Sequence, residues 1–280
     1  MNKTIDGSVP RFGLLIVGDE ILSGKRQDKH FAKVIELLSA RGLRLSWAQY
    51  LPDERDTITE TLRRTFARCA DGREVVFSCG GIGSTSDDHT RQAAAAALNV
   101  PIELHAQAER LIAERCAEMA REGRGSADMS TAENRQRLKM GEFPRGARIV
   151  ANPYNRIPGF SIGGHWFVPG FPIMAWPMIE AVLDTHYAQW FHRDPHAERS
   201  LLVFETPESE VAPLMERVEA QHPGIKAFSL PSVGDGRDGK PARRHIELGV
   251  KGPADRVDAA FETLLAGVRS SGAPFDTESR

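Results

Sequence analysis

A glycine-rich run between an apolar segment and an alanine-rich segment constrains the fold of this chain most strongly. The run extends from Ser78 to Thr90 and contains Gly80, Gly81 and Gly83. Glycine permits positive φ angles and lets backbone N–H groups come close to an anion, because no Cβ stands in the way. The start of a helix adds its own attraction for negative charge. The sequence therefore predicts a strand, a turn that binds phosphate, and a helix.

The residues that follow these glycines carry hydroxyl groups and carboxylates. Ser84, Thr85 and Ser86 supply hydroxyls for a ligand and for the N-cap of the helix. Asp87 and Asp88 would repel a bare phosphate, so they indicate a divalent cation between carboxylates and phosphate, and Mg²⁺ suits such ligands. The same aspartates also suit the positive end of a helix. For Asp87 both interpretations stay open.

Strand-like and helix-like segments alternate through the first two thirds of the chain. The expected strands are 12–17, 43–50, 74–79, 147–151 and 165–168. The expected helices are 31–38, 58–69, 87–98, 104–122 and 173–187. This alternation predicts a doubly wound, mostly parallel α/β sheet, whose loops meet at the edge where the strands end.

The composition becomes charged and polar around 192–199, which indicates a domain boundary. Beyond it the sequence predicts a strand, a helix, two strands and a helix, in the order 201–205, 208–221, 225–230, 245–250 and 254–268. This order is typical of a small α+β domain, with the glycine-rich segment 234–239 as a hairpin tip. We therefore expect domains at 1–192 and 199–270, and a tail at 271–280.

Composition narrows the class of protein. A net charge of -2 gives no general electrostatic reason to bind nucleic acid or an anionic membrane. Three cysteines without metal-type spacing indicate core residues in a reducing compartment. The first apolar run, 12–17, is too short for a signal peptide or a membrane span. We expect a cytoplasmic protein that has neither a membrane partner nor a nucleic-acid partner.

Three more loops follow predicted strands of the same sheet. Asp53 follows the second strand and is either a ligand of the site or a cap for the next helix. The other candidate ligand-binding residues of these loops are Gly18, Glu20, Ser23, Gly24, Pro169 and Gly170. Each loop alone is a weak signal, but acids at the ends of successive parallel strands gather in one crevice.

The ordered motifs of the chain resemble those of the molybdopterin-binding domain. The closest resemblance is to the amino-terminal part of the competence/damage-inducible protein A family, and a more distant one is to molybdenum-cofactor biosynthesis proteins and gephyrin. The match covers roughly 11–187. Its motifs are Gly-Asp-Glu-Ile-Leu-Ser-Gly at 18–24, Leu-Pro-Asp at 51–53, the glycine run at 80–90, Asn-Pro at 152–153, Pro-Gly at 158–159 and Pro-Gly-Phe-Pro at 169–172.

The resemblance implies a three-layer α/β/α domain that binds a pterin phosphate of the molybdopterin type, or a nucleotide, in or beside molybdenum-cofactor metabolism. Asp53 and Asp88 match acids associated with adenylylation of molybdopterin and are the catalytic candidates. Relatives in the competence-protein family imply an alternative, metal-dependent hydrolysis of a nucleotide pyrophosphate such as ADP-ribose. Asp53, Asp87 and Asp88 would then hold Mg²⁺. The sequence leaves pterin and adenine open, and we expect a homo-oligomer.

The region after Arg199 resembles the KH-type domain of the longer competence proteins. RNA binding is therefore a third hypothesis, but the segment 236–239 lies between predicted strands rather than in the helix-turn-helix setting of a Gly-x-x-Gly clamp. We expect the carboxy-terminal deamidase domain of full-length members to be absent.

The chain departs from the family pattern at three places. This chain has Ser84 where the family usually has a proline. The family usually has Gly-Thr-Ala at the positions of 155–157 and Ser-Glu-Met at the positions of 173–175. Loss of that glutamate predicts that ligand binding is retained while catalysis is weak or absent. Arg156 becomes a candidate phosphate contact. Met174 belongs either to the rim of the crevice or to the core.

Overall fold

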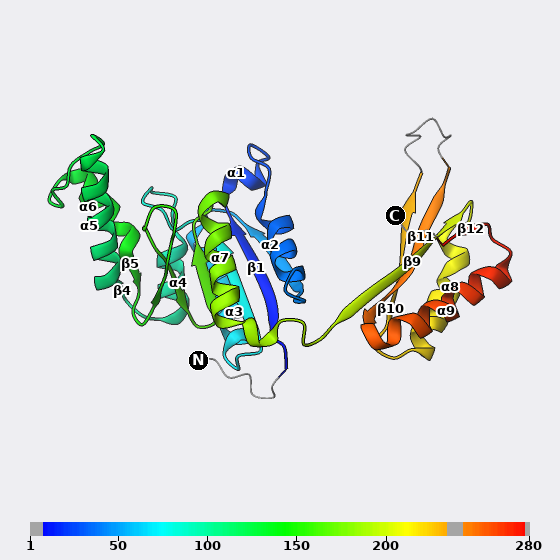
Figure 1. Cartoon of the computed structure of the whole chain (residues 1–280). Helices are drawn as coiled ribbons and strands as arrows, with labels where there is room; N and C mark the ends of the chain where they lie inside the picture. The colour runs from blue at the N-terminus through cyan, green and yellow to red at the C-terminus, as the bar shows by residue number, and fades with distance from the viewer. Residues whose placement is uncertain (1–7, 234–242, 278–280) are drawn as a thin grey trace. The chain divides into compact units, whose positions relative to one another are not determined.

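The computed structural model describes residues 8–233 and 243–277. The chain forms two compact units, Met1–Arg193 and Asp194–Arg280 (Figure 1). The predicted hairpin tip at 234–239 lies outside the described residues. Within the described ranges, no helix combines the length and the apolar character needed to span a membrane.

A six-stranded sheet in the order β2-β1-β3-β8-β7-β6 forms the centre of the first unit. Neighbours among β2, β1, β3 and β8 run parallel, whereas β7 and β6 are added antiparallel. The strands are β1 (Arg11–Val17), β2 (Leu45–Leu51), β3 (Glu74–Cys79), β6 (Arg148–Val150), β7 (Gly159–Ile162) and β8 (His165–Val168). Strands β1 and β3 are buried almost throughout, as expected of parallel strands covered on both faces. The predicted mostly parallel α/β sheet is confirmed.

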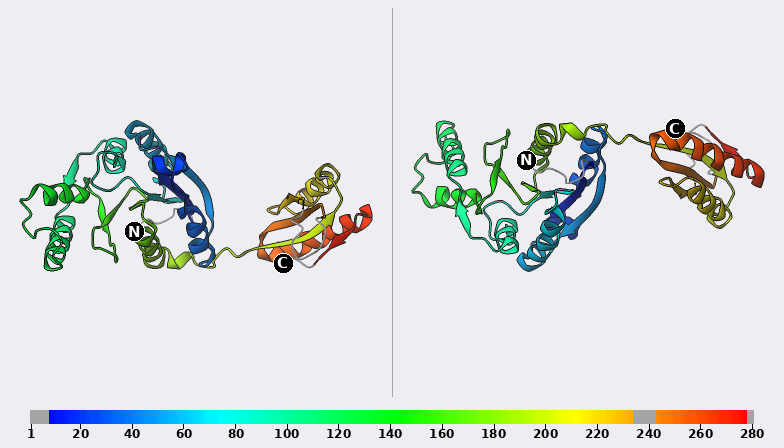
Figure 2. Two further views of the ribbon diagram at one scale, coloured as in Figure 1. Left: turned by 90° about the horizontal axis from the view of Figure 1, so that it is seen from above. Right: turned by 90° about the horizontal axis from the view of Figure 1, so that it is seen from below.

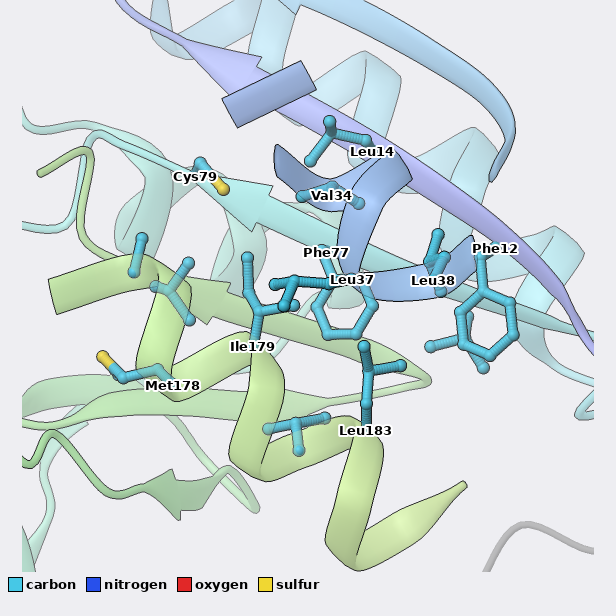
Figure 3. Close-up of a cluster of buried hydrophobic side chains, with 14 of the residues drawn as sticks. Phe12, Leu14, Val34, Leu37, Leu38, Phe77, Cys79, Met178, Ile179 and Leu183 are labelled. Atoms are coloured by element: carbon cyan, nitrogen blue, oxygen red, sulfur yellow. The ribbon is translucent and has the colours of Figure 1, made fainter. Parts of the chain in front are cut away.

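Helices form a layer on each face of this sheet. On one face, α2 (His30–Ser39) and α7 (Pro172–His186) share a core with β1 and β3. Figure 3 shows Leu37 of α2 beside Ile179 of α7, with Phe77 of β3 between the helices and the sheet. On the other face, α3 (Arg55–Cys69) and α4 (Thr90–Leu98) pack against the alternate residues of the same strands. Because alternate residues of these strands pack against helices on opposite faces of the sheet, the unit has three layers.

Several short elements of the first unit lack a signal in the sequence. The helix predicted at 104–122 is α5 (Ala106–Arg121). It begins later than predicted because Ile102–Leu104 forms β4, which pairs with β5 (Glu142–Pro144). The helices α5 and α6 (Ala132–Leu138) lie at one end of the unit, beyond the six-stranded sheet (Figure 1, Figure 2). The remaining short helices are α1 (Asp19–Leu22), η1 (Lys139–Gly141) and η2 (Ala188–Trp190).

An antiparallel sheet in the order β10-β11-β9-β12 builds the second unit. Its elements are β9 (His196–Phe204), α8 (Glu208–Gln221), β10 (Lys226–Ser232), β11 (His245–Pro253), α9 (Ala254–Ser271) and β12 (Phe275–Asp276). The predicted order of the first five elements is confirmed. The segment expected to be a tail contains strand β12. Its Phe275 packs against the core of this unit and pairs with Val203 of β9. The resulting βαββαβ unit has the ferredoxin-like arrangement.

The three cysteines are core residues, as the sequence predicts. Cys69, Cys79 and Cys116 are all free thiols and all buried. Burial raises the pKa of Cys69 to about 12, so its thiol stays protonated and unreactive at neutral pH.

Candidate functional site

A cavity of about 450 Å³ lies where the parallel strands of the first unit end. Loops after β1, β2, β3 and β8 contribute to its wall, so the predicted convergence of these loops is found in the structure. Twelve of the candidate residues line it: Gly18, Glu20, Asp53, Gly80, Gly81, Gly83, Ser84, Thr85, Asp87, Asp88, Pro169 and Gly170. Three others, Ser23, Gly24 and Ser86, are not among its lining residues.

Two of these loops are joined by a reciprocal pair of hydrogen bonds. The N–H of Asp19 donates to Asp53 Oδ2 at 2.8 Å, and the N–H of Asp53 donates to Asp19 Oδ1 at 3.2 Å. Helix α3 begins after Glu54, and no side chain caps it. Asp53 therefore connects the loop after β1 to the loop after β2, and the helix-cap interpretation is wrong.

The glycines of the turn after β3 serve the packing of the turn itself. Gly80 and Gly81 have φ angles of +106° and +67°, which side chains rarely adopt. A Cβ on Gly80 would stand 2.2 Å from the carbonyl oxygen of Val17, and one on Gly81 would stand 2.2 Å from Thr90 Oγ1. A Cβ on Gly83 would meet the carboxylate of Asp88 at 2.5 Å. The glycines thus let the turn pack against β1, α4 and Asp88, whereas the sequence predicted that they keep space for the anion.

Asp88 closes the turn with its side chain. Its Oδ1 accepts from the N–H of Gly83 at 2.7 Å, and its Oδ2 accepts from the N–H and the hydroxyl of Thr85 at 2.8 and 2.5 Å. Helix α4 starts at Thr90 after His89, without a side-chain cap. The predicted N-cap role of the hydroxyls at 84–86 is therefore wrong, and the turn is organised by Asp88 instead.

Several backbone N–H groups of this turn have no acceptor among the described residues. Within residues 8–233 and 243–277, the N–H groups of Gly81, Ile82 and Ser84 donate to no protein oxygen. All three residues line the cavity. Gly81 and Ile82 are successive residues, and successive N–H groups without partners in a turn form a concavity that attracts an anion.

Arg91 is a functional candidate that the sequence does not reveal. It lies in the first turn of α4 and is 2% exposed. Its Nη2 donates to the carbonyl oxygen of Gly83 at 2.5 Å, while its Nε and Nη1 have no partner among the described residues. Burial lowers the pKa of Arg91, and the charges of Asp88 and Glu142 raise it. A single arginine in an alanine-rich helix is too common a pattern to indicate such a position.

Carboxylates crowd the mouth of the cavity. The pKa of Asp53 is raised, first by burial and then by the nearby charges of Asp19, Glu20 and Asp87, although its hydrogen bond from Asp19 lowers it. The pKa of Asp87 is lowered, first by the nearby Thr85 side chain and then by its own backbone N–H. Repulsion among these acids makes a proton or a cation favourable beside Asp53.

The donor set does not fit the Mg²⁺ site predicted at Asp53, Asp87 and Asp88. In the described part of the chain, no group of three or more histidine, cysteine, aspartate or glutamate side chains is placed to hold a metal ion. Both oxygens of Asp88 already accept hydrogen bonds from the turn. Ligation by Asp88 would break the contacts that shape the turn.

Part of the cavity wall is apolar. Met174 and Phe171 line the cavity beside Ile157, and Phe171 is 57% exposed. The amide of Asn155 lies 3.3 Å from Met174 Sδ. Met174 thus belongs to the rim of the crevice, one of the two interpretations that the sequence left open.

Arg156 is held away from this rim. Its guanidinium pairs with Glu114 and Glu118 of α5, at 3.3 and 3.0 Å, and does not line the cavity. The predicted phosphate contact is therefore wrong. Arg156 instead ties the loop at 152–158 to α5.

Comparison with known proteins assigns the first unit to a family. Residues 13–188 match the family model described as "Probable molybdopterin binding domain". The chain belongs to the molybdopterin-binding domain family. This assignment confirms the resemblance on which the sequence predictions depend.

The chain is also similar to two curated proteins over most of its length and to one solved structure over part of it. A protein of Pyrobaculum calidifontis is 30% identical over 273 residues, which are 94% of this chain and 97% of that protein. A CinA-like protein of Anaeromyxobacter sp. is 31% identical over 91% of this chain, but the match spans only 58% of that longer protein. The crystal structure of the protein CinA with unknown function from Thermoplasma acidophilum is 25% identical, with a TM-score of 0.51, and covers 63% of this chain and 97% of that one.

Proposed function

We propose that the cavity binds a small molecule through its phosphate, a pterin phosphate of the molybdopterin type or a nucleotide. The N–H groups of Gly81, Ile82 and Ser84 carry this proposal, because they line the cavity without an acceptor among the described residues. Membership in the molybdopterin-binding family supports the pterin and favours a role in or beside molybdenum-cofactor metabolism.

The apolar wall supports a ligand with a flat ring. Phe171, Met174 and Ile157 line the cavity and offer an aromatic ring, a thioether and an aliphatic side chain. Such side chains favour stacking of a ring over binding of a second charged group. Pterin and adenine both satisfy this requirement.

Hydrolysis of a nucleotide pyrophosphate is the less favoured candidate. It would need Mg²⁺ and free carboxylates, whereas Asp88 is engaged in the turn and the described acids form no metal-holding group. Met174, moreover, stands at the rim where the family pattern has a glutamate. We therefore propose binding with weak or absent turnover.

Retention of candidate ligands tests this proposal. The purified protein would be incubated with molybdopterin, ADP-ribose or AMP, passed through a desalting column, and analysed for bound ligand. Retention of at least one ligand in a near-equimolar amount is expected. Failure to retain any of them at millimolar concentration would contradict the proposal.

An assay of ADP-ribose turnover with Mg²⁺ separates binding from hydrolysis. We expect no turnover above the uncatalysed rate. Rapid, metal-dependent turnover would make the protein a hydrolase and contradict the proposed loss of catalysis.

A further inference from the structure

The glycine turn poses an electrostatic problem for a phosphate ligand. It carries Asp87 and Asp88 directly after the N–H groups proposed to hold the anion. Two unit charges of the same sign at about 4 Å repel by about 4 kcal/mol at the effective dielectric constant near a protein surface. A phosphate can bind there only if the charge of these acids is offset.

The carboxylate of Asp88 faces the turn, and this offsets part of its negative charge. Its two oxygens accept three hydrogen bonds, from Gly83 and from the backbone and hydroxyl of Thr85. The positive ends of these bonds partly neutralise the carboxylate. The remaining negative charge still needs a cation nearby.

Arg91 places a positive charge directly behind the turn. Its guanidinium donates to the carbonyl of Gly83, in the same residue whose N–H donates to Asp88. Asp88 and Glu142 are the carboxylates close enough to influence it, and neither forms a hydrogen bond with it among the described residues. The charge of Arg91 is therefore balanced at a distance rather than in a direct ion pair.

Such a residue is costly unless it interacts with an anion. A buried charge without a paired partner costs several kcal/mol, and each buried N–H without an acceptor adds to this. Arg91 is 2% exposed and has two such donor atoms, Nε and Nη1. A phosphate on the turn would supply negative charge in front of this guanidinium.

We propose that Arg91 is the counter-charge that lets the glycine turn hold a phosphate without a bound divalent cation. Arg91 acts through Gly83 and through its field, so it is a positioning residue for the ligand. The inference rests on the proposed function, and it differs from the sequence prediction, which assigned the same task to Mg²⁺ between Asp87, Asp88 and the phosphate.

Paired titrations with AMP and adenosine in excess EDTA test the proposal. The two ligands share the ring and the ribose, so the ratio of their affinities isolates the phosphate. The variants are Arg91→Met, which removes the charge, and Arg91→Lys, which keeps it. Arg41→Met is the matched control, because Arg41 is another largely buried arginine, and its partners Asp184 and Glu180 are remote from the cavity lining.

We expect AMP to bind the unmodified protein in EDTA more tightly than adenosine. Arg91→Met should lower AMP affinity at least tenfold, or about 1.4 kcal/mol, and leave adenosine affinity within about twofold. Arg91→Lys should recover much of the loss, and Arg41→Met should change neither affinity. A merely structural role of Arg91 would lower both affinities together and would overturn the inference.

Other outcomes separate this inference from the proposed function. AMP binding that requires Mg²⁺ would overturn the metal-free inference while leaving the proposed function intact. Unchanged AMP affinity in folded Arg91→Met would do the same. Absence of AMP binding both in EDTA and with Mg²⁺, together with no retention of molybdopterin or ADP-ribose, would overturn both.

Discussion

Glycine turns stand at both ends of the six-stranded sheet, and they use glycine for different reasons. At the end where β3 stops, added Cβ atoms on Gly80 and Gly81 would meet polar atoms, the carbonyl of Val17 and the hydroxyl of Thr90. At the opposite end, between β7 and β8, added Cβ atoms on Gly163 and Gly164 would meet Phe66 and Cys69. Both turns need positive φ, but only the first lines the cavity of about 450 Å³ at the ends of the parallel strands.

The two ends of the sheet also differ in their buried polar side chains. His165, beside the Gly163–Gly164 turn, has Nε2 2.7 Å from Thr65 Oγ1 and Nδ1 3.2 Å from the carbonyl of Gly163. Arg91, beside the first turn, has two nitrogen atoms without partners in the part of the chain that the structure describes. A turn whose buried polar groups are satisfied serves the fold, and a turn that leaves them unsatisfied is a candidate for binding.

The largest expected effect comes from Gly81→Val. Steric conflict with Thr90 and the positive φ should together destabilise the first unit by about 3 kcal/mol or more and abolish binding of AMP. Chemical denaturation and calorimetric titration measure the two effects. Gly24→Ala is the control, since Gly24 has φ +73° but no atom within 4 Å of an added Cβ. Equal stability of the two variants would contradict the packing role of Gly81.

Gly164→Ala should also destabilise the first unit, by about 2 kcal/mol, because its Cβ would stand 2.8 Å from Cys69 Cβ. AMP affinity of the folded protein should stay within twofold of the unmodified value, since this turn is remote from the cavity lining. A titration below the unfolding temperature measures it. A tenfold loss of affinity would show that the two ends of the sheet are not independent.

Asp88→Asn distinguishes closure of the turn from metal ligation. Asparagine keeps one acceptor but turns a donor toward Gly83 or Thr85, so a hydrogen bond is lost and a donor is left facing another, at a cost of about 1–3 kcal/mol. We expect AMP binding in EDTA to weaken about tenfold, with a matching fall in the denaturation midpoint. If Asp88 served only a metal ion, metal-free binding would be unchanged or improved.

His165 predicts how stability depends on pH. Burial lowers the pKa of His165 from 6.5 in the unfolded chain to about 3. Between these values the unfolded state binds a proton that the folded state does not. The free energy of unfolding should therefore fall by about 1.4 kcal/mol for each pH unit below about 6. Denaturation at several pH values, compared with His165→Gln, isolates this contribution. Parallel pH profiles would contradict it.

Local sequence signals predicted the parts of the fold that depend on long, periodic segments. The apolar runs of β1 and β3 and the spacing of residues in α2 and α3 were sufficient for the α/β sheet, because burial on two faces leaves a clear pattern. Strands β4, β5 and β12 are only two or three residues long, and their pairing depends on distant partners. No local pattern predicts such pairs.

The site was predicted in location but not in detail. The topology of a parallel sheet brings the four loops together, so most candidate residues line the cavity. The direction in which a side chain points depends on tertiary contacts, which the local sequence does not specify. The carboxylate of Asp88 points into its own turn, Arg156 pairs with α5, and Arg91 reaches back to Gly83. Asp88 and Arg156 therefore make other contacts than their residue types suggested, and Arg91 makes a contact that its residue type did not suggest.

The most direct test of the central claim is a titration of the isotopically labelled protein with AMP in EDTA, observed through its backbone amide resonances. We predict that the largest shifts fall on the N–H groups of Gly81, Ile82 and Ser84, and that adenosine leaves them nearly unchanged. The Gly163–Gly164 turn should show no shift with either ligand. Binding of AMP that leaves the three amides unmoved, or that shifts the two turns equally, would contradict the account.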